Sequence, residues 1–258
     1  MAGQTHGHRL RSLGPVAFGI AIISATALMA EWLLRVGVLN RYIIPLPSEV
    51  LASFPRIVVE ENILAPFLVT AKECLYAILL VAVVGVLTGT LLYRFAALRA
   101  ATESWVAALA SAPIALMYPL FLVIFGRSTA TIVAMGFLSG LPPVILKTIE
   151  GLAGARRVLI NVGRSFNLTG GQMFAKILLP AALPAIFVGL RLGLIFCLIN
   201  IVGVEFMINF GGLGHVINDL AERYDLAGTY AAIGFVILTS ILFFVVTERI
   251  ERWLRPQT

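Results

Sequence analysis

Six apolar runs dominate the chain, and each is long enough to cross a lipid bilayer as a helix. A hydrocarbon core of about 30 Å needs about 20 helical residues. Hydrophobic residues make up 60% of the chain and charged residues only 12%, against about 25% charged in soluble domains, so a soluble globular fold is nearly excluded. We predict an all-α polytopic membrane helix bundle, a single transmembrane domain covering residues 1–258. The predicted spans are residues 12–34, 66–93, 105–126, 128–147, 177–204 and 226–248.

The basic residues indicate the orientation of this bundle. The net charge of +6 comes from short clusters between the apolar runs, which is typical of membrane topology signals and not of a nucleic-acid-binding stripe. With both termini in the cytoplasm, twice as many Lys and Arg residues fall inside as outside, as the positive-inside rule requires. The first run could instead be a signal peptide cleaved near Ala25-Thr26-Ala27, but its length exceeds the usual range of about 7–15 residues and favours a retained anchor.

Prolines and one outer segment predict local departures from straight spans. Pro113, Pro119 and the pair Pro142-Pro143 lie inside apolar runs, so we expect kinks or breaks at membrane depth, either lining a transport pathway or purely structural. Outside the membrane, Ser48 is expected to cap a surface helix. The apolar positions expected on one face of that helix are Val50, Leu51, Phe54, Ile57 and Val58.

The loop between the fourth and fifth runs, residues 150–180, carries the most informative pattern. An apolar stripe predicts a short amphipathic helix, which Asn167 is suited to end because Asn tolerates the left-handed conformation. Gly170 and Gly171 then predict a turn before a second helix enters the membrane. Such a helix either lies on lipid or docks into a groove on a partner, and spacing alone does not choose. The stripe consists of Val158, Leu159, Val162 and Phe166.

This segment resembles a loop of a known family. The stretch NVGRSFNLTGGQMFAKILLPAALP is similar to the cytoplasmic EAA loop of permease subunits of binding-protein-dependent ABC importers, whose Ile-x-Leu-Pro ending stands here as Ile177-Leu178-Leu179-Pro180. Leu46-Pro47-Ser48 and Gly212-Leu213-Gly214 resemble segments of the nitrate, sulfonate and taurine branch. The resemblance runs from about Asn40 to Arg255.

The resemblance implies a function. It implies a type I permease of the inner membrane that pairs with a second copy of itself and with two ABC ATPase subunits, which hold ATP and Mg. It also implies an external solute-binding protein that delivers a sulfonate-, nitrate- or taurine-like anion, or alternatively a pyrimidine-type vitamin precursor. No GxxxxGK[ST] phosphate loop occurs in the sequence, so this chain is expected to be non-catalytic, with ATP hydrolysis on a separate subunit. The coupling residues carried over are Asn161, Val162, Gly163, Arg164, Phe166, Asn167 and Gly170.

This sequence departs from the family pattern at two positions of the loop. Asn161 stands where the family has Glu, and Asn167 stands where it has Gly. Asn167 is a mild change because Asn adopts the left-handed conformation. Asn161 keeps hydrogen-bonding groups but loses the charge, so we expect a matching change on the partner or weaker coupling.

Polar residues within the runs are candidates for the translocation pathway. Arg191 is the only charge well inside a run, and an intramembrane charge suits an anion pathway, although it could instead snorkel or bond backbone carbonyls. Asn200 either lines the pathway or bonds a neighbouring helix. Met117 and Tyr118 beside Pro119 are similar candidates.

Other classes find less support. Cys74 and Cys197 each lie in an apolar run, and the three histidines, His6, His8 and His215, are expected to face solvent, so we expect no disulfide, metal site or intramembrane protease. An ion-coupled secondary transporter is the alternative from another class, but it would normally show intramembrane carboxylates. The acidic residues near the runs sit at their ends: Glu31, Glu73, Glu205 and Glu248.

Overall fold

The computed structural model describes residues 7–254, with side chains for residues 17–249, and all of its regular structure in this range is helical. The prediction of an all-α fold is confirmed. The side chains of His6 and His8, expected to face solvent, lie outside the described residues. The elements are α1 (Gly7–Arg35), α2 (Pro47–Val59), α3 (Leu64–Arg94), α4 (Ala96–Ser111), η1 (Ile114–Met117), α5 (Tyr118–Phe125), α6 (Thr129–Ala153), α7 (Arg157–Ser165), α8 (Gly170–Met173), η2 (Phe174–Leu178), α9 (Leu179–Ile208), α10 (Leu213–Glu222) and α11 (Leu226–Leu254).

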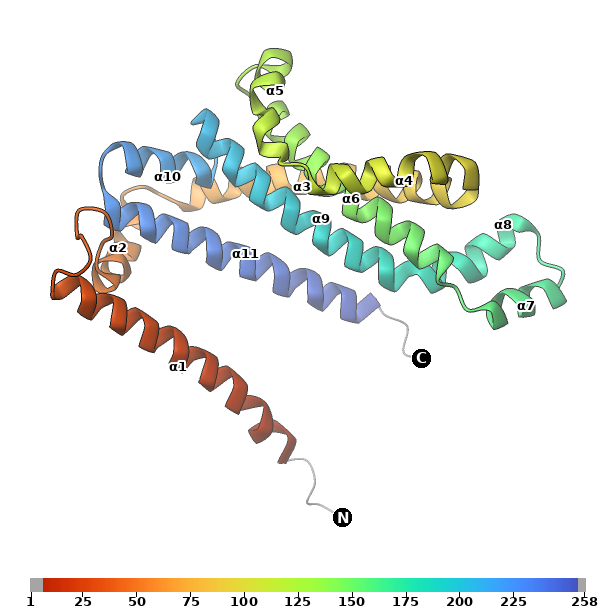
Figure 1. Cartoon of the computed structure of the whole chain (residues 1–258), viewed down its shortest axis with the longest axis horizontal. Coiled ribbons are helices and arrows are strands. Elements are labelled where there is room, and N and C mark those ends of the chain that lie inside the picture. The colour runs from red at the N-terminus through yellow and green to blue at the C-terminus, as the bar shows by residue number, and fades with distance from the viewer. Residues whose placement is uncertain (1–6, 255–258) are drawn as a thin grey trace.

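The core of the bundle forms where α6 packs against both α3 and α9 (Figure 1). Its buried side chains include Val81, Met135 and Ile201. At Gly140 an added Cβ would lie only 2.8 Å from the carbonyl oxygen of Gly193. Small residues thus allow the backbones of α6 and α9 to approach closely, as is common between membrane helices. Both cysteines are buried in this cluster as free thiols.

Five helices are long and apolar enough to span a membrane, and a sixth span results if α4 and the η1–α5 segment are counted together. These two parts meet at an angle of 90°. The break expected at Pro113 is confirmed, since Ala112 leaves the helical conformation with ψ of 138° and a residue before proline disfavours that conformation. The third predicted span therefore consists of two helical segments, and the first of them, α4, begins at Ala96, before the predicted start at residue 105.

A kink or break is expected at Pro142-Pro143, and no break occurs there. Helix α6 continues through both prolines from Thr129 to Ala153. The Ser139 hydroxyl donates to the carbonyls of Gly136 and Phe196 at 2.9 and 3.1 Å, so it joins α6 to α9. Packing on two sides holds the helix in place despite the backbone hydrogen bonds that proline removes.

Helix α1 stands apart from the bundle and meets it at α2 (Figure 1). The prediction that Ser48 caps α2 is wrong, because the helix already begins at Pro47, a residue suited to the first helical position. The hydroxyl and amide of Ser48 instead donate to the Glu31 carboxylate of α1 at 2.8 and 3.1 Å. Ala25-Thr26-Ala27 lies within the continuous helix α1.

Helix α2 packs against α10 and α11 in a second core. Ile57 is fully buried there, and Val50 and Phe54 pack beside it, as the apolar face predicted. Leu51 is 70% exposed and Val58 38% exposed, so this part of the predicted face stays outside the cluster.

An ion pair fastens the start of α11 to α2. The Arg56 guanidinium donates to Asp225, whose other oxygen accepts the amide of Gly228 at 2.9 Å. Burial alone would raise the pKa of Asp225, but the Gly228 amide and Arg56 outweigh it and hold that pKa below its ordinary value of 3.8. The same hydrogen bond raises the pKa of Arg56.

Substitutions of Asp225 should distinguish the stability contributed by the helix cap from that contributed by the ion pair. We expect D225A to lose about 1 kcal/mol for the cap and less than about 1 kcal/mol for the partly exposed pair, while D225N keeps the cap. Because the pKa of Asp225 is lowered, the stability from the pair is present above pH 3.8 and disappears as pH falls through the folded-state pKa. Melting temperatures measured against pH check this, and equal losses in D225A and D225N would contradict the cap.

Candidate functional site

Helix α7 projects from the end of the bundle opposite to α2 and α10 (Figure 1). The amphipathic helix predicted here is confirmed, and its apolar stripe faces outward. Val158 and Phe166 are 70% and 75% exposed, and Leu159 and Val162 are also exposed. A short helix in water normally buries such a stripe, so this surface is suited to bind a partner.

Helix α7 ends as the sequence predicted. Asn167 adopts a left-handed conformation with φ of 49°, and the amide of Leu168 reaches back to the carbonyl of Gly163 at 3.1 Å. Thr169 and Gln172 then form a reciprocal capping box that starts α8. The chain continues through η2 into α9, so α7 is connected through α8 and η2 to a membrane-spanning helix.

Gly163 seats α7 on this continuation. It is the buried residue of α7, and an added Cβ would lie 2.6 Å from Cδ1 of Ile177 and 2.7 Å from Cε of Met173. The face of α7 near Gly163 therefore rests on α8 and η2, whereas its apolar stripe is free. Sequence reasoning did not identify Met173 and Ile177, although their spacing of four residues could have suggested a shared helix face.

The remaining predicted coupling residues surround this helix. Asn161, Arg164 and Asn167 are exposed, and Gly170 is exposed at the start of α8. The fold therefore groups all seven predicted coupling residues on or beside one protruding segment.

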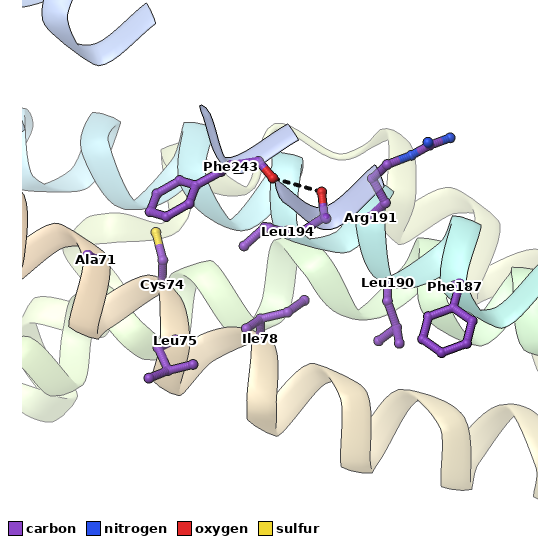
Figure 2. Close-up of a pocket in the computed structure, with 10 residues that line it drawn as sticks. Ala71, Cys74, Leu75, Ile78, Phe187, Leu190, Arg191, Leu194 and Phe243 are labelled. Atoms are coloured by element: carbon purple, nitrogen blue, oxygen red, sulfur yellow. Dashed lines mark hydrogen bonds between the residues drawn. The ribbon is translucent and has the colours of Figure 1, made fainter. Parts of the chain in front are cut away.

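An apolar cavity of about 500 Å³ lies between α3, α9 and α11. Figure 2 shows Cys74, Ile78 and Leu194 on its walls and Arg191 at one end, with the Arg191 side chain extending away from Ile78. The guanidinium carbon of Arg191 lies 5.2 Å from the centre of the Phe244 ring. This arrangement gives an apolar space with a positive charge at its margin.

The four predicted pathway residues do not form one site within a single chain. Met117 is exposed and Tyr118 packs against the core at the bend between α4 and α5. The Asn200 amide donates to the Phe196 carbonyl of its own helix at 3.2 Å. Arg191 lines the cavity described above.

Other polar residues lie elsewhere than the sequence suggested. His215 is half-buried and bonds the side chain of Asn209, so the expectation that it faces solvent is wrong. Glu73 and Glu205 lie near the ends of their runs but are 1% and 0% exposed. Within the described residues no group of three or more His, Cys, Asp or Glu side chains could hold a metal ion.

A multi-pass helix bundle with an amphipathic helix outside it, whose apolar stripe is exposed, is typical of a membrane protein. The sequence profile of binding-protein-dependent transport system inner membrane components matches residues 81–257, and the chain belongs to this family.

Individual relatives agree with this assignment. A putative aliphatic sulfonates transport permease protein, SsuC of Bacillus subtilis, is 25% identical over 85% of this chain and 77% of its own length. The formylaminopyrimidine transport permease protein ThiX of Halalkalibacterium halodurans is 26% identical over 67% of this chain and 70% of its own. The glycine betaine/proline betaine permease protein ProW of Escherichia coli is 31% identical over 68% of this chain and 49% of its own.

The fold is also similar to a solved structure. A chain of the inward-facing MetNI methionine ABC transporter matches with a TM-score of 0.62 and 21% identity over 71% of this chain and 91% of that chain. The protein is thus an ABC importer permease of the membrane, a non-catalytic subunit whose partners are a separate ATPase and a solute-binding protein. The alternative of an ion-coupled secondary transporter is set aside.

Proposed function

We propose that this permease works as a homodimer in which each α7 docks into a cytoplasmic ATPase subunit. The observation that carries the proposal is the exposed apolar stripe of α7. Val162 and Phe166 supply its apolar contacts, and Asn161 supplies hydrogen bonds where the family has a Glu. Movement of the ATPase would reach α9 through Gly163 and its neighbours Met173 and Ile177, so the helices are biased between two arrangements by a docked partner.

The same proposal includes an orientation in the membrane. If α4 and the η1–α5 segment together form one span, six crossings would put both termini on the same side as the loop that holds α7. In Figure 1, α11 runs towards the end of the bundle from which α7 projects. The excess of Lys and Arg on this side supports a cytoplasmic location for α7 and both termini.

The cargo is proposed to be a small organic anion of the sulfonate, nitrate or taurine type. An apolar cavity with Arg191 at its margin suits an aliphatic chain with an anionic head. Similarity to the aliphatic sulfonates permease supports this class. A pyrimidine-type vitamin precursor is the second candidate, since a formylaminopyrimidine permease is also similar.

Gentle purification of the tagged protein from membranes of its own host tests the assembly. We expect mass spectrometry to find a P-loop ATPase, with two ATPase copies for every two permease copies. A permease dimer without ATPase, even after crosslinking, would contradict the docking role of α7, and a single permease copy would contradict the homodimer. A solute-binding protein that co-purifies can then be titrated with an alkylsulfonate and with formylaminopyrimidine, and preference for the second would reject the anion.

Changing Arg191 should affect transport and leave assembly intact. We expect R191Q to lower uptake of the anion at least about tenfold, because the charge at the cavity is lost, while R191K keeps part of the rate. ATPase recovery on purification should not change, since Arg191 lies away from α7. Full uptake by R191Q would assign Arg191 a structural role only.

A further inference from the structure

Two buried carboxyl groups lie against each other where α3, α9 and the start of α10 meet. Glu73 belongs to α3 and Glu205 to α9. Thr70, whose hydroxyl binds Glu205, lies one helical turn before Glu73 on α3, so the two carboxyl groups are neighbours. Both are essentially inaccessible, at 1% and 0% exposed. Like charges at such a position would repel each other in a medium of low dielectric constant.

The surroundings of Glu205 are built for a carboxylate. One oxygen accepts the hydroxyl of Thr70 at 2.7 Å, and the other accepts the amide of Gly214 at 2.8 Å. Gly214 lies at the start of α10, where the helix dipole favours a negative charge. The amide of Leu213 donates in turn to the Thr70 oxygen at 2.8 Å. Glu205 therefore joins α3, α9 and α10 as an acceptor.

Glu73 is in the opposite situation. Neither of its carboxyl oxygens has a hydrogen-bond partner, and its neighbours are the Glu205 carboxyl group and the Thr129 hydroxyl. Two carboxyl groups therefore lie side by side, and no hydrogen bond of the described residues satisfies Glu73. A buried carboxylate without partners is very costly, and such groups normally become neutral.

Neighbouring groups of the described chain do not supply the missing positive charge. Arg127 and His215 are the nearby basic groups from the segment before α6 and from α10, and both bind Asn209. On α3 the adjacent titratable groups are the buried thiol of Cys74 and the amine of Lys72, which is exposed at the surface. The described residues also hold no group of three or more His, Cys, Asp or Glu side chains that could hold a metal ion.

We propose that Glu73 and Glu205 form a site for a single proton, carried by Glu73 and donated to Glu205. The O–H bond of Glu73 supplies the donor that the pair lacks, and the site keeps one negative charge for the amide of α10. Release of the proton to solvent breaks this bond and leaves two carboxylates side by side, so it loosens α3 from α9 and α10 at this end of the bundle. The proposal does not depend on the cargo or on ATPase docking.

Infrared spectroscopy of the full-length protein, with its co-purifying subunits in lipid nanodiscs, tests the site. We expect the wild type at neutral pH to show the carbonyl stretch of a protonated carboxylic acid. The band should be lost in E73Q and unchanged in E60Q, a matched control at an exposed glutamate. Absence of the band from the wild type overturns the proposal, as does its persistence in E73Q.

Melting temperature gives a second, independent readout. A proton bound in the folded state stabilises less as pH rises, so the wild type should lose stability as the pH is raised above neutral. E73Q, whose amide cannot lose its donor, should lose less than half as much. If E73Q does not fold, loss of the wild-type infrared band on raising pH supports the proposal, and a band unchanged at pH 9 rejects it. If sodium stabilises the wild type at fixed pH and the infrared band is absent, the site holds a metal ion and not a proton, and the proposal is rejected.

Discussion

Aspartate in place of Val162 or Phe166 should remove the ATPase from the purified transporter. Both side chains lie on the exposed stripe of α7, and docking would bury each for about 1.5–3 kcal/mol. A carboxylate at either position loses this gain and buries a charge without a partner. We expect each variant to weaken association by at least about tenfold and the double variant by at least about 100-fold, with ATP-driven uptake lost in parallel.

A matched control separates docking from added charge. Ala153 is exposed at the end of α6, just before α7, so A153D adds the same charge close by and should leave association intact. V162D and F166D should keep the melting temperature of the wild type, because both side chains are exposed. Unchanged ATPase recovery with V162D and F166D together would reject α7 as the docking helix.

Alanine at Gly214 should destabilise the protein more than other glycine substitutions outside the core. An added Cβ would lie 2.2 Å from the carbonyl oxygen of Val202 and 2.5 Å from the amide nitrogen of Phe206. Both are backbone atoms of α9 and cannot move aside by changing rotamer. Helix α10 would have to shift and lose its hydrogen bond to Glu205. We expect a loss of about 3 kcal/mol, or roughly 6–12 °C in melting temperature.

Gly203 provides the comparison for this variant. Gly203 lies in α9 next to Val202, whose carbonyl an added Cβ at Gly214 would meet, but an added Cβ at Gly203 meets nothing within 4 Å. G203A should therefore leave the melting temperature unchanged or raise it slightly, because Ala favours a helix interior over Gly by about 0.5–1 kcal/mol. Thermal unfolding in detergent, followed by size-exclusion chromatography, measures both variants. Equal stability of G214A and G203A would contradict the close contact between α10 and α9.

Features that depend on neighbouring residues in the chain were predictable from the sequence. The stripe from Val158 to Phe166 follows from helical periodicity, and the end of α7 follows from the tolerance of Asn167 for a positive φ. The bend at Pro113 follows from the steric effect of proline on the residue before it. The apolar runs likewise required a membrane bundle, because so much apolar surface cannot be buried in one core of this size.

Tertiary packing alone decided the features that depend on distant segments. Pro142 and Pro143 stay inside a helix because α3 and α9 hold α6 from two sides. Ser48 bonds Glu31 of another helix and does not cap its own. Glu73 and Glu205 come from segments far apart in the sequence, so the run ends on which they lie gave no sign that their carboxyl groups meet. Local periodicity specifies which face of a helix is apolar, but only the assembled bundle determines which polar groups it encloses together.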